Sequence, residues 1–249
     1  MNRRMRFEIR SRLLGLLLAA ACLVPTSGRA ALSPQATVSL ITVAPGTALY
    51  DSFGHTALWV YDSTNQIDRV YGYGTYNFNA PNFYGKFVRG QLDYMISVMD
   101  MGSFLASYQE ENRSVVDQVL DLSADQKERV YAFLEKNYLP ENRYYKYDFF
   151  FDNCTTRVRD VLRTIGGDSL QFSPPREKRS FRRWIDQYLQ EQDWADFGMD
   201  LGQGAISDRV ATPYESMFLP NTLMQGLERA TLLRNGRAQR LVSQTRTLF

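Results

Sequence analysis

The sequence predicts an α+β fold, because strand-like and helix-like segments fall into separate parts of the chain. Runs of β-branched residues or alternating apolar side chains are concentrated before residue 121. Apolar stripes with helical spacing and recognisable N-caps are concentrated after it. This segregation is typical of α+β domains rather than of alternating α/β ones.

Five strands are predicted in the first half of the chain. They are Thr37–Val43, Phe53–Tyr61, Ile67–Tyr76, Tyr94–Val98 and Ser114–Leu120. The second and third are expected to pair as a hairpin, because turn-forming residues occupy 63–66 between them. Residues 102–111, between the last two strands, are expected to form a short helix.

Two further helices flank the most informative segment of the chain. The first begins at Ser123, where Gln126 completes a capping box, and runs to Tyr138. The second runs from Ser180 to Gln190, after a Pro-Pro loop. A glycine-rich stretch at 198–204 is expected to be irregular. Near the C-terminus, Asn235-Gly236 predicts a hairpin within residues 228–249.

The helix that begins near Cys154 is the one that the sequence predicts most clearly. Asp152 or Asn153 can serve as its N-cap, and Gly166-Gly167 is suited to end it. Its apolar stripe consists of Val158, Val161, Leu162 and Ile165. Cys154 continues this stripe, so the thiol is expected to face the core or a cleft from the first helical turn.

The N-terminus predicts export. Five arginines precede an apolar run at 13–24, which is too short to span a bilayer, and small residues precede a cut after Ala30. We therefore expect a signal peptide at 1–30 and a single periplasmic domain at 31–249. The alternative is a lipoprotein whose Cys22 carries the lipid anchor.

Composition excludes several functions. The first 30 residues hold six Arg and one Glu, so the net charge of +2 for the whole chain becomes −3 for the remainder, which argues against nucleic-acid binding. After residue 30 the chain has one His and one Cys, too few for the usual zinc sites. No phosphate-binding glycine loop or serine nucleophile elbow occurs. We expect neither a metal nor another cofactor.

Cys154 is the candidate nucleophile. A thiol at a helix N-terminus meets unpaired N–H groups and the positive end of the helix dipole, which predicts a lowered pKa. The first-turn N–H groups are also placed to stabilise an oxyanion. Asn153, Thr155 and Arg157 are therefore candidates for oxyanion or thiolate support. The alternative is that Cys154 is a small buried hydrophobic residue.

His55 is the candidate general base. It alternates along its strand with Phe53, Ala57 and other apolar residues, and hairpin pairing places it opposite about Gly74. Glycines before it and at 72–74 leave room for a ligand. The sequence does not identify the residue that orients the imidazole, because four candidates lie on nearby segments: Asp62, Asp68, Tyr71 and Asn77. The alternative is a structural histidine in the core.

Five motifs together resemble the Lnb-type N-terminal periplasmic domain family of bacteria. They are Ser-Phe-Gly-His-Thr-Ala-Leu-Trp-Val at 52–60, Tyr-Gly-Tyr-Gly-Thr-Tyr-Asn-Phe at 71–78, Pro-Asn-Phe-Tyr-Gly-Lys-Phe-Val-Arg-Gly at 81–90, Asp-Asn-Cys-Thr-Thr-Arg-Val-Arg-Asp at 152–160 and Asp-Arg-Val-Ala-Thr-Pro-Tyr-Glu-Ser-Met-Phe-Leu-Pro at 208–220. The resemblance implies a circularly permuted papain-like fold, in which the histidine strand precedes the cysteine helix. It also implies Cys154 as nucleophile, His55 as base, and lipid or lipoprotein acyl chains as the transferred group.

One difference from that family leaves the substrate open. Full Lnb-type acyltransferases have a membrane-spanning C-terminal region, and this sequence has no such stretch. We therefore expect a thiol-dependent acyltransferase or hydrolase with a lipid or lipoprotein substrate. The alternatives are a peptidase or amidase on peptidoglycan peptides and a non-catalytic envelope binding module.

Two basic runs carry less information. Residues 176–183 contain five basic side chains, and the last 21 residues contain five arginines and no acid. Solvated surfaces are the preferred interpretation of both. The alternative is peripheral contact with anionic headgroups at a membrane surface.

Overall fold

The computed structural model describes residues 32–48, 51–76, 93–190, 194 and 203–249. These belong to one compact unit, Leu32–Phe249. The predicted signal peptide, Cys22, Asn77, the motif at 81–90 and most of the glycine-rich stretch lie outside the described residues.

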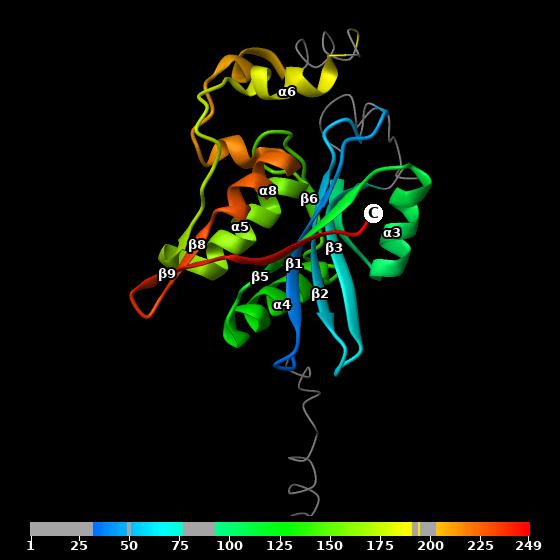
Figure 1. Ribbon diagram of the computed structural model, residues 1–249. Helices are drawn as coiled ribbons and strands as arrows, with labels where there is room; N and C mark the ends of the chain where they lie inside the picture. Colours follow the sequence, from blue (N-terminus) through cyan, green and yellow to red (C-terminus); the bar gives the residue numbers. More distant parts are fainter. Residues whose placement is uncertain (1–31, 49–50, 77–92, 191–193, 195–202) are drawn as a thin grey trace, which may run out of the picture. The chain divides into compact units, whose positions relative to one another are not determined.

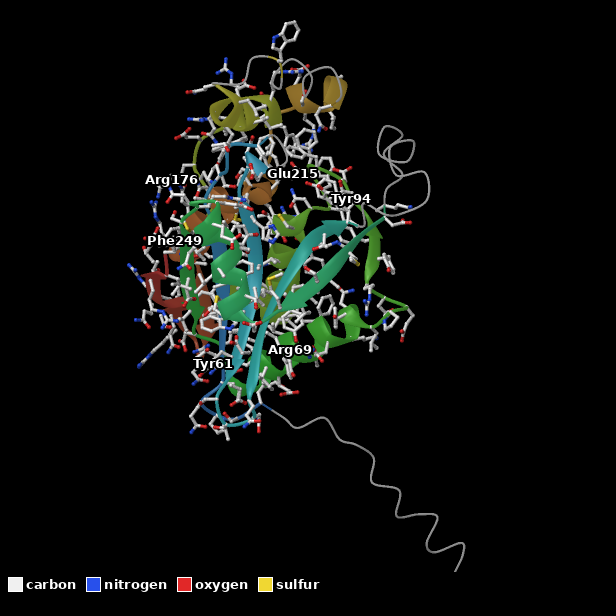
Figure 2. All side chains as sticks on the ribbon, turned by 90° about the vertical axis from the view of Figure 1, so that its right-hand side faces the viewer. Tyr61, Arg69, Tyr94, Arg176, Glu215 and Phe249 are labelled. Carbon is white, nitrogen blue, oxygen red and sulfur yellow. The ribbon has the colours of Figure 1, made fainter. Side chains whose placement is uncertain are left out.

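A seven-stranded antiparallel sheet lies at the centre of the domain, in the strand order β10-β5-β1-β2-β3-β4-β6. Its strands are β1 (Thr37–Val43), β2 (His55–Asp62), β3 (Ile67–Tyr76), β4 (Asp93–Met99), β5 (Val115–Leu120), β6 (Tyr144–Lys146) and β10 (Val242–Thr247). The predicted α+β class is confirmed. β2 and β3 form the predicted hairpin; Figure 2 shows Tyr61 and Arg69 near its turn and Tyr94 towards the opposite end of the sheet.

Helices cover both faces of this sheet. The described helices are α3 (Met101–Glu110), α4 (Ala124–Tyr138), α5 (Cys154–Gly166), α6 (Phe181–Leu189) and α8 (Pro220–Glu228), with short 3₁₀ turns η2 (Gly167–Ser169), η3 (Gly204–Asp208) and η4 (Glu215–Phe218). Figure 1 shows α4, α5 and α8 on one side of the sheet and α3 on the other.

The alternation of side chains along β2 divides the core into two layers. Leu58 and Val60 are fully buried in the cluster beneath α4, α5 and α8. Ala57 points the other way, into a second cluster that α3 closes with Met101 and Phe104. His55 is in phase with Ala57, so its side chain belongs to the α3 face.

The three C-terminal strands are divided between two sheets. β7 (Leu170–Gln171), β8 (Thr231–Arg234) and β9 (Arg237–Arg240) form a small second sheet. Asn235 and Gly236 both have positive φ at the β8–β9 turn. The chain then continues into β10, which pairs with β5 more than 100 residues earlier. Local patterns do not encode such a distant pairing, and the sequence analysis missed it.

Gly54 fixes where β2 begins. Its φ is +79°, and a Cβ at this position would lie 2.5 Å from the carbonyl oxygen of Val43. The predicted strand began at Phe53, whereas this left-handed residue delays the regular strand until His55. The candidate base is therefore the first residue of a rigid element.

We predict that Gly54→Ala destabilises the domain far more than Gly204→Ala does. Both glycines have positive φ, which costs an alanine about 1–2 kcal/mol. Only Gly54 adds a backbone clash, worth about 1–3 kcal/mol more, because a Cβ on Gly204 would meet nothing within 4 Å. Urea unfolding midpoints measure the difference, and equal midpoints would contradict this account of the turn.

Candidate active site

Cys154 is the first residue of α5, and Asn153 is the N-cap of that helix. The Asn153 Oδ1 accepts hydrogen bonds from the N–H groups of Thr155 and Thr156, both at 2.8 Å. Of the two predicted caps, Asn153 is the one used. The half-buried thiol packs against the main core cluster, which confirms that it continues the apolar stripe of the helix.

The loops that precede the two candidate residues are tied to one another. The Asn153 Nδ2 donates to the carbonyls of Phe149 at 2.7 Å and Phe218 at 3.0 Å. The Phe149 ring meets the Phe53 ring edge to face, with centroids 5.0 Å apart. Because Phe53 lies two residues before His55, this aromatic contact joins the histidine loop to the cysteine loop.

The strongest link between strand and helix involves the residues next to the candidate pair. The hydroxyls of Thr56 and Thr155 are hydrogen-bonded at 3.1 Å and fully buried. The backbone N–H of Thr56 donates to the Cys154 thiol, and the Thr155 hydroxyl lies 3.8 Å from Sγ. The sulfur therefore lies against the peptide that joins His55 to Thr56.

Two glycines of β3 line the space around the pair. A Cβ on Gly72 would lie 3.0 Å from the Nε2 of His55, so the imidazole packs directly on this backbone. A Cβ on Gly74 would lie 3.9 Å from the Cβ of Cys154. Gly74 has a φ of +97° at an irregularity in the β3–β4 pairing, and this deformation brings the strand against the helix terminus.

A cavity of about 230 Å³ opens between the sheet and α3. Its lining includes His55, Gly72, Gly74, Thr75, Ser97 and Tyr108. Cys154 is not part of the lining; the thiol lies behind Gly74, which has no side chain to separate it from the cavity. The structure therefore brings the base and the two glycines together at the cavity, with Cys154 next to Gly74 and outside the lining.

The imidazole is held neutral. Burial, together with the smaller effect of the positive charge on Arg113, lowers the pKa of His55 to about 4. At neutral pH the ring therefore has a lone pair able to accept a proton.

The thiol is held neutral as well, which corrects one sequence expectation. The helix terminus was expected to lower the pKa of Cys154, but burial raises it. Hydrogen bonds from Thr56 and Thr155 oppose this effect and are outweighed. The resting groups are therefore a neutral thiol and a neutral imidazole rather than a thiolate and an imidazolium.

The three residues expected to support an oxyanion or thiolate have other partners. Asn153 uses both ends of its amide as cap and loop anchor. The Thr155 N–H is taken by that cap. Arg157 binds Asp152 through two hydrogen bonds, at 2.6 and 2.8 Å, and its guanidinium lies 3.6 Å from the centre of the Tyr145 ring. In this first turn, the N–H of Cys154 has no partner on another described residue and lies towards its own thiol.

The candidates for orienting the imidazole are also used elsewhere. Asp62 lies at the far end of β2, Asp68 faces the start of α3, and Tyr71 points to α4; Asn77 is not among the described residues. Their partners are Ser33, Thr64 and Asn65 for Asp62, Trp59 and Met101 for Asp68, and Glu135 for Tyr71. Among the described residues, none is hydrogen-bonded to the His55 ring.

Arg113 and Tyr108 are neighbours of the site that the sequence analysis missed. Arg113 is only 6% exposed and donates to the Ala44 carbonyl at 2.9 Å and to Glu111 at 2.7 Å. Its guanidinium lies 5.0 Å from the centre of the Tyr108 ring. The spacing of Phe104 and Tyr108 on one helical face was a visible signal, but only the packing of α3 on the sheet brings them to His55.

Comparison with protein families identifies the chain. The model described as the Lnb N-terminal periplasmic domain matches residues 27–186. The chain belongs to this family. The matched segment contains both Cys154 and His55, and the family confirms the expected periplasmic location. The comparisons with curated proteins and with solved structures gave no match.

Two further observations concern the part of this Lnb-family domain that the structure describes. It contains no helix that is both long and apolar enough to cross a membrane. Nor do three His, Cys, Asp or Glu side chains meet there as a metal ion would require.

We predict that iodoacetamide alkylates Cys154 only slowly at neutral pH, with a rate that rises steeply in alkaline solution. Burial raises the pKa of this thiol, so the reactive thiolate gains population only above the ordinary range of a cysteine. Peptide mass mapping of Cys154 as a function of pH measures the profile, with glutathione as reference. A plateau between pH 5 and 7 would indicate a preformed thiolate and contradict the neutral pair.

Proposed function

We propose that this protein is a cell-envelope cysteine acyltransferase or hydrolase that acts on a lipid or lipoprotein acyl group through an acyl-cysteine intermediate. The observation that carries the proposal is the buried hydrogen bond at 3.1 Å between Thr56 and Thr155, the immediate chain neighbours of His55 and Cys154. Membership of a periplasmic family is consistent with an envelope substrate.

The order and packing of the elements support a circularly permuted papain-like arrangement. The histidine strand β2 precedes the cysteine helix α5 in the chain, and α5 packs on the antiparallel sheet that contains β2. A nucleophile on a helix and a base on a strand are both placed on rigid elements, which fixes their geometry.

The neutral resting pair suggests a proton transfer coupled to attack. As the Cys154 Sγ forms a bond to the carbonyl carbon, the thiol proton passes to the imidazole of His55. The carbonyl becomes a tetrahedral oxyanion, for which the N–H of Cys154 is the available backbone donor. Collapse breaks the bond to the leaving group, which takes the proton from the imidazolium and leaves a thioester on Cys154.

The second half of the reaction returns the enzyme to its starting state. Water or an acceptor amine attacks the thioester carbonyl and transfers a proton to the neutral His55 ring. The sulfur then departs and recovers that proton as a thiol. Attack by water gives hydrolysis, and attack by an amine gives acyl transfer.

The cavity supports a second candidate, a peptidase or amidase acting on peptidoglycan peptides. The hydroxyl-bearing residues Thr75, Ser97 and Tyr108 line this space with His55, and the Thr75 hydroxyl donates to that of Ser97 at 2.8 Å. Such groups suit the amides of a peptide better than the methylenes of an acyl chain. Purified sacculi and a phospholipid acyl donor, each treated with wild type and with Cys154→Ala, distinguish the two candidates by which product depends on the thiol.

We predict that p-nitrophenyl butyrate acylates Cys154 and that the reaction depends on His55. Intact mass should show one added butyryl group, mapped to Cys154, and His55→Gln should slow its formation by about 100-fold or more. Below about pH 4 the base is protonated, so the rate should rise as the pH increases through this value and then level off. Failure of wild type to gain butyryl would leave a non-catalytic binding module as the better account.

We predict further that Gly72→Ala slows this acylation by about tenfold, because its Cβ would displace the imidazole by a few tenths of an ångström. Gly102→Ala is the matched control. Its Cβ would make a similar 3.1 Å contact, but with Asp100 on α3 instead of with the base. Equal rates for the two variants would show that the packing of the His55 ring against Gly72 of β3 has no bearing on the chemistry.

A further inference from the structure

Tyr108 stands out among the groups that the proposed reaction does not use. It projects from α3 into the cavity that His55 also lines. No described residue is hydrogen-bonded to its hydroxyl, just as none is bonded to the His55 ring. Two polar side chains that are hydrogen-bonded to no described residue therefore line the same cavity, where a bound molecule has access to both.

The Tyr108 ring is held firmly from two sides. It meets the Phe104 ring edge to face, with centroids 4.8 Å apart. The guanidinium of Arg113 lies 5.0 Å from the ring centre. Arg113 is in turn fixed by the Ala44 carbonyl and by Glu111, as described above. A hydroxyl on a ring held in this way is a preorganised donor rather than a mobile one.

The hydroxyl stays protonated and lies within electrostatic reach of the thiol. Burial raises the pKa of Tyr108 to about 12, and negative charge on Cys154 contributes to the rise. The phenol is therefore a donor throughout the pH range of the periplasm, and it responds to charge that develops at the nucleophile.

The residues expected to stabilise an oxyanion do not provide a second donor, because the Asn153 amide, the Thr155 N–H and the Arg157 guanidinium all have other partners. Only the Cys154 N–H remains in the first turn of the helix. On this basis we propose that Tyr108 is a catalytic residue, which donates a hydrogen bond to the carbonyl oxygen of the substrate as that oxygen becomes an oxyanion. This inference rests on the proposed function.

Tyr145 provides a matched control. Its hydroxyl is also buried without a partner, and its pKa is also raised by burial and by charge on Cys154. However, Tyr145 packs beneath α5 against Arg157 and does not line the cavity. The two tyrosines share the electrostatic contact with the thiol and differ in access to a ligand.

The test compares two reactions of the same thiol. Acylation of Cys154 by p-nitrophenyl butyrate develops an oxyanion, whereas alkylation by iodoacetamide at a saturated carbon does not. We expect Tyr108→Phe to slow acylation about 100-fold and to leave alkylation within twofold of wild type. Tyr145→Phe should leave both rates close to those of wild type.

Each other outcome overturns the inference. If Tyr108→Phe slows both reactions equally, Tyr108 supports the thiol or its surroundings rather than the oxyanion. If neither rate changes, or if Tyr145→Phe alone slows acylation, the donor is elsewhere. If wild type is alkylated but never acylated, the proposed function itself fails. If wild type is acylated and Tyr108→Phe is acylated at the same rate, only the role of Tyr108 fails.

Discussion

The hydrogen bond between the buried hydroxyls of Thr56 and Thr155 is the contact on which the site depends. It joins the first turn of the cysteine helix to the start of the histidine strand, 99 residues earlier in the chain. Each hydroxyl would be left unsatisfied in the core without the other, which is costly and therefore fixes the register of helix against strand. His55 and Cys154 are the immediate chain neighbours of these two threonines, so their relative placement follows from this bond.

Burial, rather than the helix dipole, sets the protonation of the pair. The same close packing that brings strand and helix together removes water from both side chains. Desolvation disfavours the charged forms, which raises the pKa of the thiol and lowers that of the imidazole. A neutral pair needs a substrate carbonyl before charge develops. This protects the thiol from adventitious modification in an oxidising compartment.

Much of the fold was accessible from local sequence, and the reasons can be seen in single elements. β1 and β3 have the bounds predicted from their residue patterns, and Ser123 with Gln126 forms the expected capping box. β2 starts later than predicted because Gly54 has a left-handed conformation. The pairing of β10 with β5 depends on contacts between distant segments, so no local sequence pattern predicts it.

The candidate site also contains residues that the sequence predicted and residues that only the packing revealed. Cys154 and His55 stood out because each is the only residue of its type after residue 30, one in the first turn of a predicted helix and the other on a predicted strand. The pKa of the thiol was predicted in the wrong direction because a sequence shows a helix terminus but not the layers that bury it. Tyr108 and Arg113 were missed because only the packing of α3 on the sheet brings them to the imidazole. Asp62 and Asp68 are near His55 in sequence, but they form their hydrogen bonds at the opposite end of the β2–β3 hairpin.

The central claim is that the sulfur of Cys154 and the ring of His55 face a common substrate carbonyl. Cross-linking with 1,3-dibromoacetone tests it most directly, since this reagent joins a sulfur to a ring nitrogen only across a three-carbon bridge. The chain has a single histidine, so peptide mass mapping identifies the bridged product without ambiguity. The account predicts a cross-linked pair of peptides containing Cys154 and His55 in the native protein and none in urea. Alkylation of Cys154 in the folded protein with His55 left free would contradict it.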